Sequence, residues 1–278
     1  MKKITSILLA ALMLFGLAGC SSGTNNAASA EAAAPAQEDD AAYITNKGSL
    51  LIGITIFDPM NYYDENNKLV GFDTEFAEAV CSKLGIKPEF VVINWDTKEV
   101  ELAAKSIDCI WNGMTITEER KANMEFSKPY IKNKQCVVIQ AANASAFTDT
   151  ASLAGKNLVA EISSAGEEAI QTEDNLKNGN YVAVEKQSDA LLEVKAGTAD
   201  AAVIDYVMAK SMVGEGTDYS DLMIIEGVDL AVEEYGIGFR KGSSFAAIVD
   251  STIDQILADG TLQAIAEKYG QSDVLLLG

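Results

Sequence analysis

The chain has 278 residues, a net charge of −20 and no histidine. The acidic excess argues against nucleic acid as a partner, because phosphate contacts need clusters of Lys and Arg. The lack of histidine excludes histidine-based triads and zinc–histidine sites, and we expect neither a cofactor nor a metal.

The first twenty residues are typical of a bacterial export signal. Two lysines precede an apolar run at 4–18, which is shorter than the roughly 20 residues that a transmembrane helix needs. The tetrapeptide Leu-Ala-Gly-Cys at 17–20 resembles the bacterial lipobox, in which the cysteine is acylated after cleavage. We therefore predict a signal peptide at 1–19 and a lipid anchor at Cys20, on the cell surface or in the periplasm. A plain secretory peptide cleaved nearby is the alternative.

The segment 20–42 consists mostly of Ala, Ser, Asn and acidic residues, and it lacks aromatic side chains. Such a segment cannot bury enough apolar surface to fold, so it predicts a flexible, disordered tether.

The other three cysteines, Cys81, Cys109 and Cys136, lie in apolar runs and form no CxxC pair. This pattern predicts buried thiols that act as small apolar side chains. The sequence leaves undecided whether Cys109 and Cys136 form a disulfide.

The rest of the chain alternates short apolar runs with amphipathic stretches. The first series has predicted strands at 50–56, 90–94 and 107–111 and predicted helices at 73–84 and 97–106. We expect Asp73 to cap the first helix and Gly85 to end it. This β-α-β-α-β order predicts a mostly parallel sheet covered by helices.

A second series of the same kind follows a β-rich run at 135–140. Its predicted strands are 157–162, 181–185, 201–205 and 222–226, and its predicted helices are 166–177, 189–196 and 206–213. A strand at 235–240 and helices at 245–257 and 261–269 end the chain. We therefore expect two α/β lobes, with ligand contacts at the carboxyl ends of the strands.

One ordered set of short motifs resembles the polar-amino-acid family of ABC-transporter solute-binding proteins. The main stretches are Asn-Gly-Met-Thr-Ile-Thr-Glu-Glu-Arg at 112–120 and Phe-Ser-Lys-Pro-Tyr at 126–130. Gly-Phe-Asp at 71–73 and Ala-Asp-Ala at 199–201 match in the same order. The resemblance implies a two-lobed clamp of the type II periplasmic-binding-protein kind, in which each lobe is a mostly parallel sheet with flanking helices and two crossover strands join the lobes.

The resemblance also implies how the chain is divided and what it binds. Lobe 1 is expected at 43–133 and 235–278, and lobe 2 at 134–234. The protein, a monomer, is expected to bind a free polar or basic amino acid between the lobes. It would deliver this ligand to the permease and ATPase of an ABC importer.

A free amino acid needs a cation for its α-carboxylate and an anion for its α-ammonium group. Arg120 suits the carboxylate, because a guanidinium group can hold it through two parallel hydrogen bonds, and the resemblance implies help from Thr115. Asp205 ends a buried apolar strand and suits the ammonium group, with the carbonyl groups of Asn112 and Gly113 as further acceptors. The alternatives are a solvated helix arginine and a helix-capping aspartate.

The remaining candidates surround the same ligand. Ser164 and Ala165 open a helix whose free N–H groups favour an anion, and the resemblance implies that they bind the carboxylate from lobe 2. Phe57 and Trp95 would stack on the ligand side chain. The alternatives are ordinary helix capping for the first pair and core packing for the second.

Glu161 interrupts an apolar strand at a position that, by resemblance, faces the ligand side chain, and a carboxylate there favours a side chain with donors. The alternative is a solvent-facing residue on an edge strand. Basic-amino-acid binders of the family carry an acid where this chain has Ile54, so a basic ligand is not settled, and Asp58 is a possible substitute.

Two other functions stay open. A few relatives of the fold eliminate groups from small carboxylic acids with a proton-donating acid in the cleft, and Glu161 is the candidate for that acid. A sensor-associated receptor would need a separate signalling partner. We expect a binding protein without catalytic residues.

Overall fold

The computed structural model describes residues 39–276. The predicted signal peptide, Cys20 and most of the predicted tether lie outside the described residues. None of the helices within 39–276 is long and apolar enough to cross a membrane.

The first sheet has the strand order β4-β1-β5-β12-β6. Its strands are β1 (Ser49–Ile54), β4 (Lys87–Val92), β5 (Cys109–Ile110), β6 (Met124–Phe126) and β12 (Gly238–Arg240). β1 pairs in parallel with β4 and β5, whereas β12 pairs antiparallel with β5 and β6. The sheet is mixed but mostly parallel, because only β12, where the end of the chain returns, runs opposite to the other four strands.

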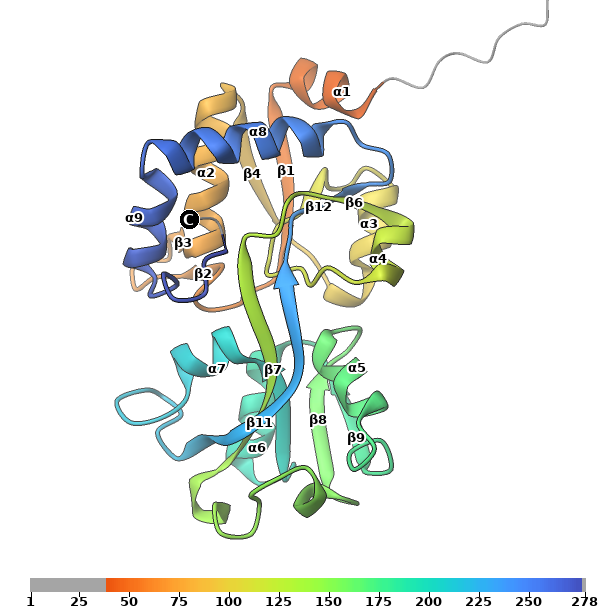
Figure 1. Cartoon of the computed structure of the whole chain (residues 1–278), viewed down its shortest axis with the longest axis vertical. Helices are drawn as coiled ribbons and strands as arrows, with labels where there is room; N and C mark the ends of the chain where they lie inside the picture. Colours follow the sequence, from red (N-terminus) through yellow and green to blue (C-terminus); the bar gives the residue numbers. More distant parts are fainter. Residues whose placement is uncertain (1–38, 277–278) are drawn as a thin grey trace, which may run out of the picture. The chain divides into compact units, whose positions relative to one another are not determined.

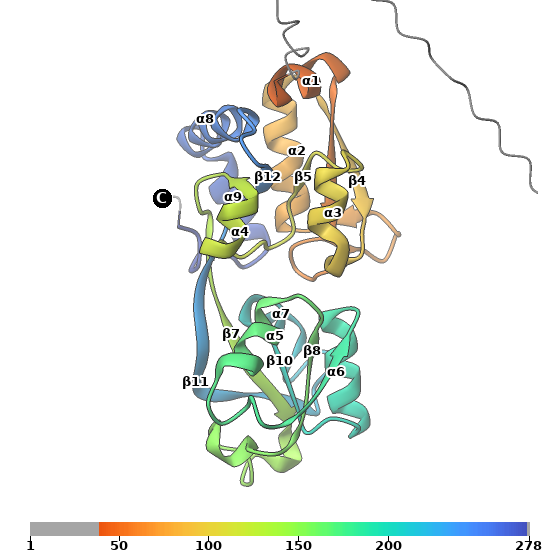
Figure 2. The same ribbon diagram turned by 90° about the vertical axis from the view of Figure 1, so that its right-hand side faces the viewer.

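The second sheet has the order β11-β7-β10-β8-β9. Its strands are β7 (Ile131–Gln140), β8 (Asn157–Glu161), β9 (Asn180–Val184), β10 (Ala201–Asp205) and β11 (Leu222–Tyr235). β8 pairs in parallel with β9 and β10, and β7 pairs antiparallel with β10 and β11. The long strands β7 and β11 lie side by side and connect the two sheets (Figures 1 and 2). We call each sheet with its helices lobe 1 and lobe 2.

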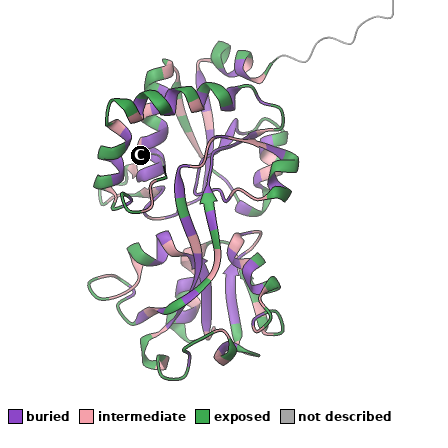
Figure 3. Ribbon diagram, in the orientation of Figure 1, coloured by how far each residue is buried: buried purple, intermediate pink, exposed green. Residues whose placement is uncertain are grey.

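Helices cover both sheets. In lobe 1 they are α1 (Asp40–Lys47), α2 (Phe72–Leu84), α3 (Lys98–Ala103), α4 (Glu118–Asn123), α8 (Phe245–Ala258) and α9 (Thr261–Lys268), with the 3₁₀ turn η1 (Trp95–Thr97) and the hairpin β2 (Tyr62–Tyr63) and β3 (Leu69–Val70). In lobe 2 they are α5 (Ala165–Thr172), α6 (Gln187–Ala196) and α7 (Tyr206–Met212), with turns η2 (Ala141–Asn143) and η3 (Ala151–Leu153). Buried residues follow the central strands of each sheet (Figure 3).

The three predicted buried thiols are confirmed. Cys81, Cys109 and Cys136 are free and at most 1% exposed. Burial raises the pKa of the Cys81 thiol to about 12 and that of Cys109 well above its usual range, so these thiols are unreactive. Cys109 and Cys136 do not form a disulfide.

Asp73 does not cap α2, which corrects the sequence-based expectation. Gly71 occupies the capping position, and the fully buried carboxylate of Asp73 turns inward instead. It accepts hydrogen bonds from the backbone N–H of Gly113 at 2.8 Å and from the hydroxyl of Tyr130 at 3.0 Å. Burial raises the pKa of Asp73 to about 7. Asp73 therefore holds the loop that follows β5 in place. This role depends on Gly113 and Tyr130, which lie far from Asp73 in the sequence.

The helix α1 begins at Asp40 and so reaches into the segment that composition predicts to be a tether. Its acidic residues have partners in lobe 1: Asp40 accepts from Arg240 Nε at 2.7 Å and from the hydroxyl of Ser243 at 2.7 Å. Composition alone underestimates how far the folded part of the chain extends into this segment, because it counts charged residues without their partners.

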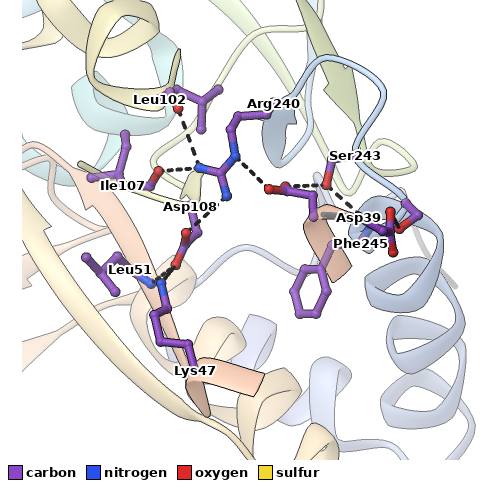
Figure 4. A network of polar contacts seen from close by, with 11 residues as sticks. Asp39, Lys47, Leu51, Leu102, Ile107, Asp108, Arg240, Ser243 and Phe245 are labelled. Atoms are coloured by element: carbon purple, nitrogen blue, oxygen red, sulfur yellow. Dashed lines mark hydrogen bonds and ion pairs between the residues drawn. The ribbon is translucent and has the colours of Figure 1, made fainter. Parts of the chain in front are cut away.

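Arg240 lies at the centre of this polar network, which Figure 4 shows. Its guanidinium group also contacts Asp108 at 3.1 Å and the carbonyl oxygen of Ile107 at 2.6 Å. Asp108, whose side chain is fully buried, forms a second ion pair with Lys47. The network ties α1 to β5 and β12.

Asp108→Asn should destabilise the protein by about 3 kcal/mol, because it leaves the charges of Arg240 and Lys47 partly uncompensated in a buried site. Urea unfolding followed by circular dichroism measures the change. The control is Asp174→Asn, which removes an exposed carboxylate paired with Lys177 and should leave the midpoint unchanged. Equal midpoints for both variants would show that the buried network adds nothing.

Candidate functional site

A cavity between the lobes is lined by all ten residues that the sequence proposes as ligand contacts. They are Phe57, Trp95, Asn112, Gly113, Thr115, Arg120, Glu161, Ser164, Ala165 and Asp205. Most of them follow or end strands at the edges of the two sheets that face each other. The carboxyl ends of β1 and β5 meet those of β8 and β10 there, as expected for α/β sheets.

Arg120 is buried, with 9% of its surface exposed, so the alternative of a solvated helix arginine is wrong. The hydroxyl of Thr117 caps α4 by accepting from the backbone N–H of Arg120. The guanidinium group donates to the carbonyl oxygens of Thr115 at 2.9 Å and of Ser163 at 3.4 Å. No carboxylate within residues 39–276 lies within ion-pair distance of it.

This arrangement leaves a buried cation without an ion-pair partner among the described residues, although carboxylates such as Glu233 and Glu168 act on it from farther away. Burial lowers the pKa of Arg120, but a guanidinium group stays protonated at any physiological pH. Removing such a charge from water without a partner is costly. An anion that enters the cavity would offset this cost.

Asp205 ends β10 and does not cap α7, although it occupies the capping position. Its carboxylate accepts from the side-chain amides of Asn133 at 2.5 Å and Gln135 at 2.8 Å, and from the hydroxyl of Tyr235 at 2.7 Å. These donors are neutral, so they hold the carboxylate in place without cancelling its charge. They come from β7 and β11, the strands that connect the lobes.

Glu233 shares two of these donors, the amides of Asn133 and Gln135. Burial and the neighbouring charge of Asp205 raise the pKa of Glu233 to about 8. Two carboxylates that share one set of donors do not ionise together easily. At neutral pH Glu233 therefore keeps its proton, and of the two residues only Asp205 lines the cavity.

The loop after β5 brings the backbone close to the cavity. The side-chain amide of Asn112 donates to the carbonyl oxygen of Thr55 at 3.0 Å, and its oxygen accepts from the Thr55 hydroxyl at 2.8 Å. Gly113 has φ of +57°, and a Cβ added there would meet the ring of Phe57 at 2.6 Å. Only glycine therefore allows this approach.

Both aromatic candidates line the cavity and also pack in hydrophobic cores. Phe57 is 3% exposed and Trp95 is 6% exposed. Core packing and a ligand contact are compatible for both rings. The ammonium group of Lys98 lies 4.8 Å from the centroid of the Trp95 ring.

The start of α5 provides the lobe 2 side of the cavity. The hydroxyl of Ser164 accepts from the backbone N–H of Glu167 at 3.2 Å, so the ordinary capping role of Ser164 is confirmed. The capping hydroxyl leaves the backbone N–H groups of the first turn available to an anion.

Glu161 ends β8, which lies between β10 and β9 and is not an edge strand. The residue is 4% exposed, so the solvent-facing alternative is wrong. Burial, followed by the charge of Asp205, raises the pKa of Glu161 to about 8. Asp58 does not line the cavity, because its carboxylate accepts from the hydroxyl of Ser211 at 2.6 Å.

A model of the bacterial extracellular solute-binding proteins, family 3, matches residues 50–272. The chain belongs to this family. It is 27% identical over 233 residues to the L-cystine-binding protein of Escherichia coli strain K12, a match that covers 83% of this chain and 86% of that protein.

Two solved structures are similar to this family member. Tv2483 bound to L-arginine matches with a TM-score of 0.80 at 27% identity, covering 86% of this chain and 97% of that one. The ancestral amino acid-binding protein AncCDT-1, a precursor of cyclohexadienyl dehydratase, matches with a TM-score of 0.73 at 29% identity, covering 82% and 97%. These likenesses agree with the two-lobed type II fold.

The cavity of this solute-binding protein has two further lining residues that sequence reasoning missed, Thr55 and Gln187. Thr55 directly follows β1. Gln187 begins α6, two residues before the predicted start at 189, and its oxygen accepts from the backbone N–H of Asp205 at 2.9 Å. Both follow strand ends at the same sheet edges, so the strand-end rule applied to β1 and β9 would have found them.

The close packing at Gly113 leads to a stability prediction. Gly113→Ala should cost about 1–2 kcal/mol for the left-handed backbone and about 1–3 kcal/mol more for the clash with Phe57. Gly155→Ala is the matched control, because Gly155 has φ of +72° and no atom within 4 Å of an added Cβ. Urea unfolding of both variants isolates the clash, and equal losses would contradict a tightly packed cavity wall.

Proposed function

We propose that this protein binds a free amino acid between its lobes and delivers it to an ABC importer. The observation that carries this proposal is one buried cation without an anionic partner, Arg120, in the same cavity as one carboxylate held only by neutral donors, Asp205. A zwitterion supplies both missing charges at once. A ligand with a carboxylate alone would leave Asp205 uncompensated.

The roles follow from this pairing. Arg120 binds the α-carboxylate together with the turn at Ser164 and the first free N–H group of α5 at Ala165. Asp205 accepts from the α-ammonium group, with Thr115 and the carbonyl groups of Asn112 and Gly113 as further acceptors. The ligand side chain would lie between Phe57 and Trp95 and extend toward Glu161.

The cargo class follows from Glu161. This buried carboxylate favours a side chain that donates hydrogen bonds or carries a positive charge, hence a polar or basic amino acid. The similarity to proteins named for cystine and arginine binding agrees with this class.

Delivery is proposed from the family and from the lipobox. A lipid anchor at Cys20, outside the cytoplasm, would keep a monomeric receptor near the permease and its ATPase, which raises the local concentration of loaded protein. We propose that lobe 1 comprises 40–133 with 235–278, which starts earlier than the predicted residue 43 because α1 belongs to it, and that lobe 2 comprises 134–234.

A thermal-shift screen of the twenty amino acids with cystine and ornithine tests the ligand class. A ligand at 100 times its Kd stabilises the protein by about 2.7 kcal/mol, which is easily detected.

Arg120→Ala and Asp205→Ala should each weaken binding of the best ligand at least about 100-fold by calorimetry, because each leaves one ligand charge buried and unpaired. Lys121→Ala, next to Arg120 but half-exposed, is the control and should bind normally. Normal binding by both cavity variants would refute the site.

The raised pKa of Glu161 predicts a pH dependence. A cationic side chain binds the ionised carboxylate, so affinity for a basic amino acid should rise with pH and level off above about pH 8. The slope should approach tenfold per pH unit well below that pKa. Calorimetry from pH 6 to 9 measures it.

Two comparisons isolate Glu161 in this titration, since Glu233 and Lys98 also titrate near pH 8. Glu161→Gln should flatten the profile for a basic ligand. A neutral amino acid should show little slope even with the parent protein. A slope that persists in Glu161→Gln would assign the titration to another group.

An acid with a raised pKa in a cleft is also what a proton-donating catalyst needs. We expect none, because the likenesses above are to amino-acid-binding proteins. Incubation with prephenate and with arogenate should leave both compounds unchanged by chromatography. Multiple turnovers would replace the transport proposal with the dehydratase alternative.

A further inference from the structure

Direct bonds between the two lobes concentrate on Ser163, which lies between β8 and α5. Its hydroxyl donates to Asp96 at 2.6 Å, and its carbonyl oxygen accepts from Lys98 Nζ at 3.1 Å and from Arg120 Nη2 at 3.4 Å. All three partners belong to lobe 1. One residue of lobe 2 thus binds three side chains across the mouth of the cavity.

The backbone of Ser163 is unusual for its residue type. Its φ is +57°, in the left-handed region that costs a non-glycine residue about 1–2 kcal/mol. Its N–H donates to the carboxylate of Glu167 at 2.6 Å, which holds the turn. This conformation brings the carbonyl oxygen within hydrogen-bonding distance of two cations of lobe 1. A strained conformation that persists at a contact between lobes indicates a role in that contact.

The hydrogen bonds of Lys98 indicate that this contact between the lobes is specific. The residue is 4% exposed, and its ammonium group donates to the carbonyl oxygens of Trp95 at 3.0 Å and Ser163 at 3.1 Å. Burial lowers the pKa of Lys98 to about 8. Its acceptors are thus one oxygen from each lobe, so lobe closure is what completes its hydrogen bonding.

We propose that Ser163 is a latch that closes lobe 2 onto lobe 1 and positions Arg120 for the ligand. Its bonds join protein groups only, so they stabilise the closed form whichever ligand is bound. The larger the closed fraction before binding, the smaller the loss of apparent affinity. The inference rests on the proposed function only in the role given to Arg120.

A second contact between lobes provides an internal control. The hydroxyl of Ser211 on α7 donates to Asp58 of lobe 1 at 2.6 Å, and the partners of Ser163 are different residues, Asp96, Lys98 and Arg120. Independent contacts should have additive effects, whereas two halves of one bond should not.

The closed fraction can be measured without any amino acid. Single-molecule energy transfer would use fluorophores on Lys83→Cys in lobe 1 and Lys177→Cys in lobe 2, both half-exposed positions. Cys81, Cys109 and Cys136 are buried and will not be labelled, and Cys20→Ser in every labelled protein removes the remaining native thiol. Ser163→Ala and Asp96→Ala should each lower the closed fraction, and the double variant should add little to either one. Ser211→Ala should add fully to Ser163→Ala.

Ligand binding gives the second measurement. The lost charge-assisted bond should raise the dissociation rate of the best ligand about tenfold in Ser163→Ala and in Asp96→Ala. Ser163→Gly keeps the backbone conformation and also loses the hydroxyl, so it should match Ser163→Ala if the hydroxyl matters.

The outcomes separate the latch from the proposed function. Unchanged closed fractions and dissociation rates in Ser163→Ala and Asp96→Ala, or full additivity between them, would overturn the latch. A failure of amino-acid binding would leave the closed-fraction result standing, because that measurement needs no ligand.

Discussion

Arg120 is a buried cation without a carboxylate within ion-pair distance in the described part of the chain, and the cavity is organised around it. The charge cannot be removed by deprotonation, so its burial must be compensated by an anion. Asp205, across the same cavity, has the opposite need. These two side chains lie on different lobes, and a zwitterion between them favours the closed form over the open one.

The polar groups behind these charges give them fixed positions. Asn133, Gln135 and Tyr235 hold Asp205, and they belong to the strands that connect the lobes. In lobe 1, the buried Asp73 holds the N–H of Gly113 in the loop that leads to Arg120. A ligand bound as proposed would contact Asp205, which is hydrogen-bonded to the connecting strands, so the binding free energy could act on the lobe geometry.

As proposed, the contacts of Ser163 contribute to the free energy of lobe closure independently of the ligand. Its contacts to Asp96, Lys98 and Arg120 join the lobes beside the ligand site, whereas the ion network around Arg240 stabilises lobe 1 alone. The Arg240 network stabilises the structure of lobe 1, whereas the Ser163 contacts, as proposed, contribute to the free energy of lobe closure.

The sequence by itself determined most of the order of elements and ten of the residues that line the cavity. Asp205 was identified as a charge at the end of a buried apolar strand, and such ends meet at one edge of an α/β sheet. Arg120 was identified from its chemistry and its motif, and Glu161 as a charge that interrupts an apolar strand and from the family resemblance. Many strand and helix positions followed from local periodicity, but the strand predicted at 222–226 continues as β11 to Tyr235, and α1 was not predicted.

Only the tertiary structure decided which partners these residues have. Lys98 and Ser163 are 65 residues apart, Gly113 and Asp73 are 40 apart, and Arg240 and Asp40 are 200 apart. Local patterns carry no information on such pairs, so Asp73 was taken for a helix cap and Asp40 for part of a tether. The mixed sheets have the same origin, because the direction of β12 depends on where the chain returns and not on its own residues.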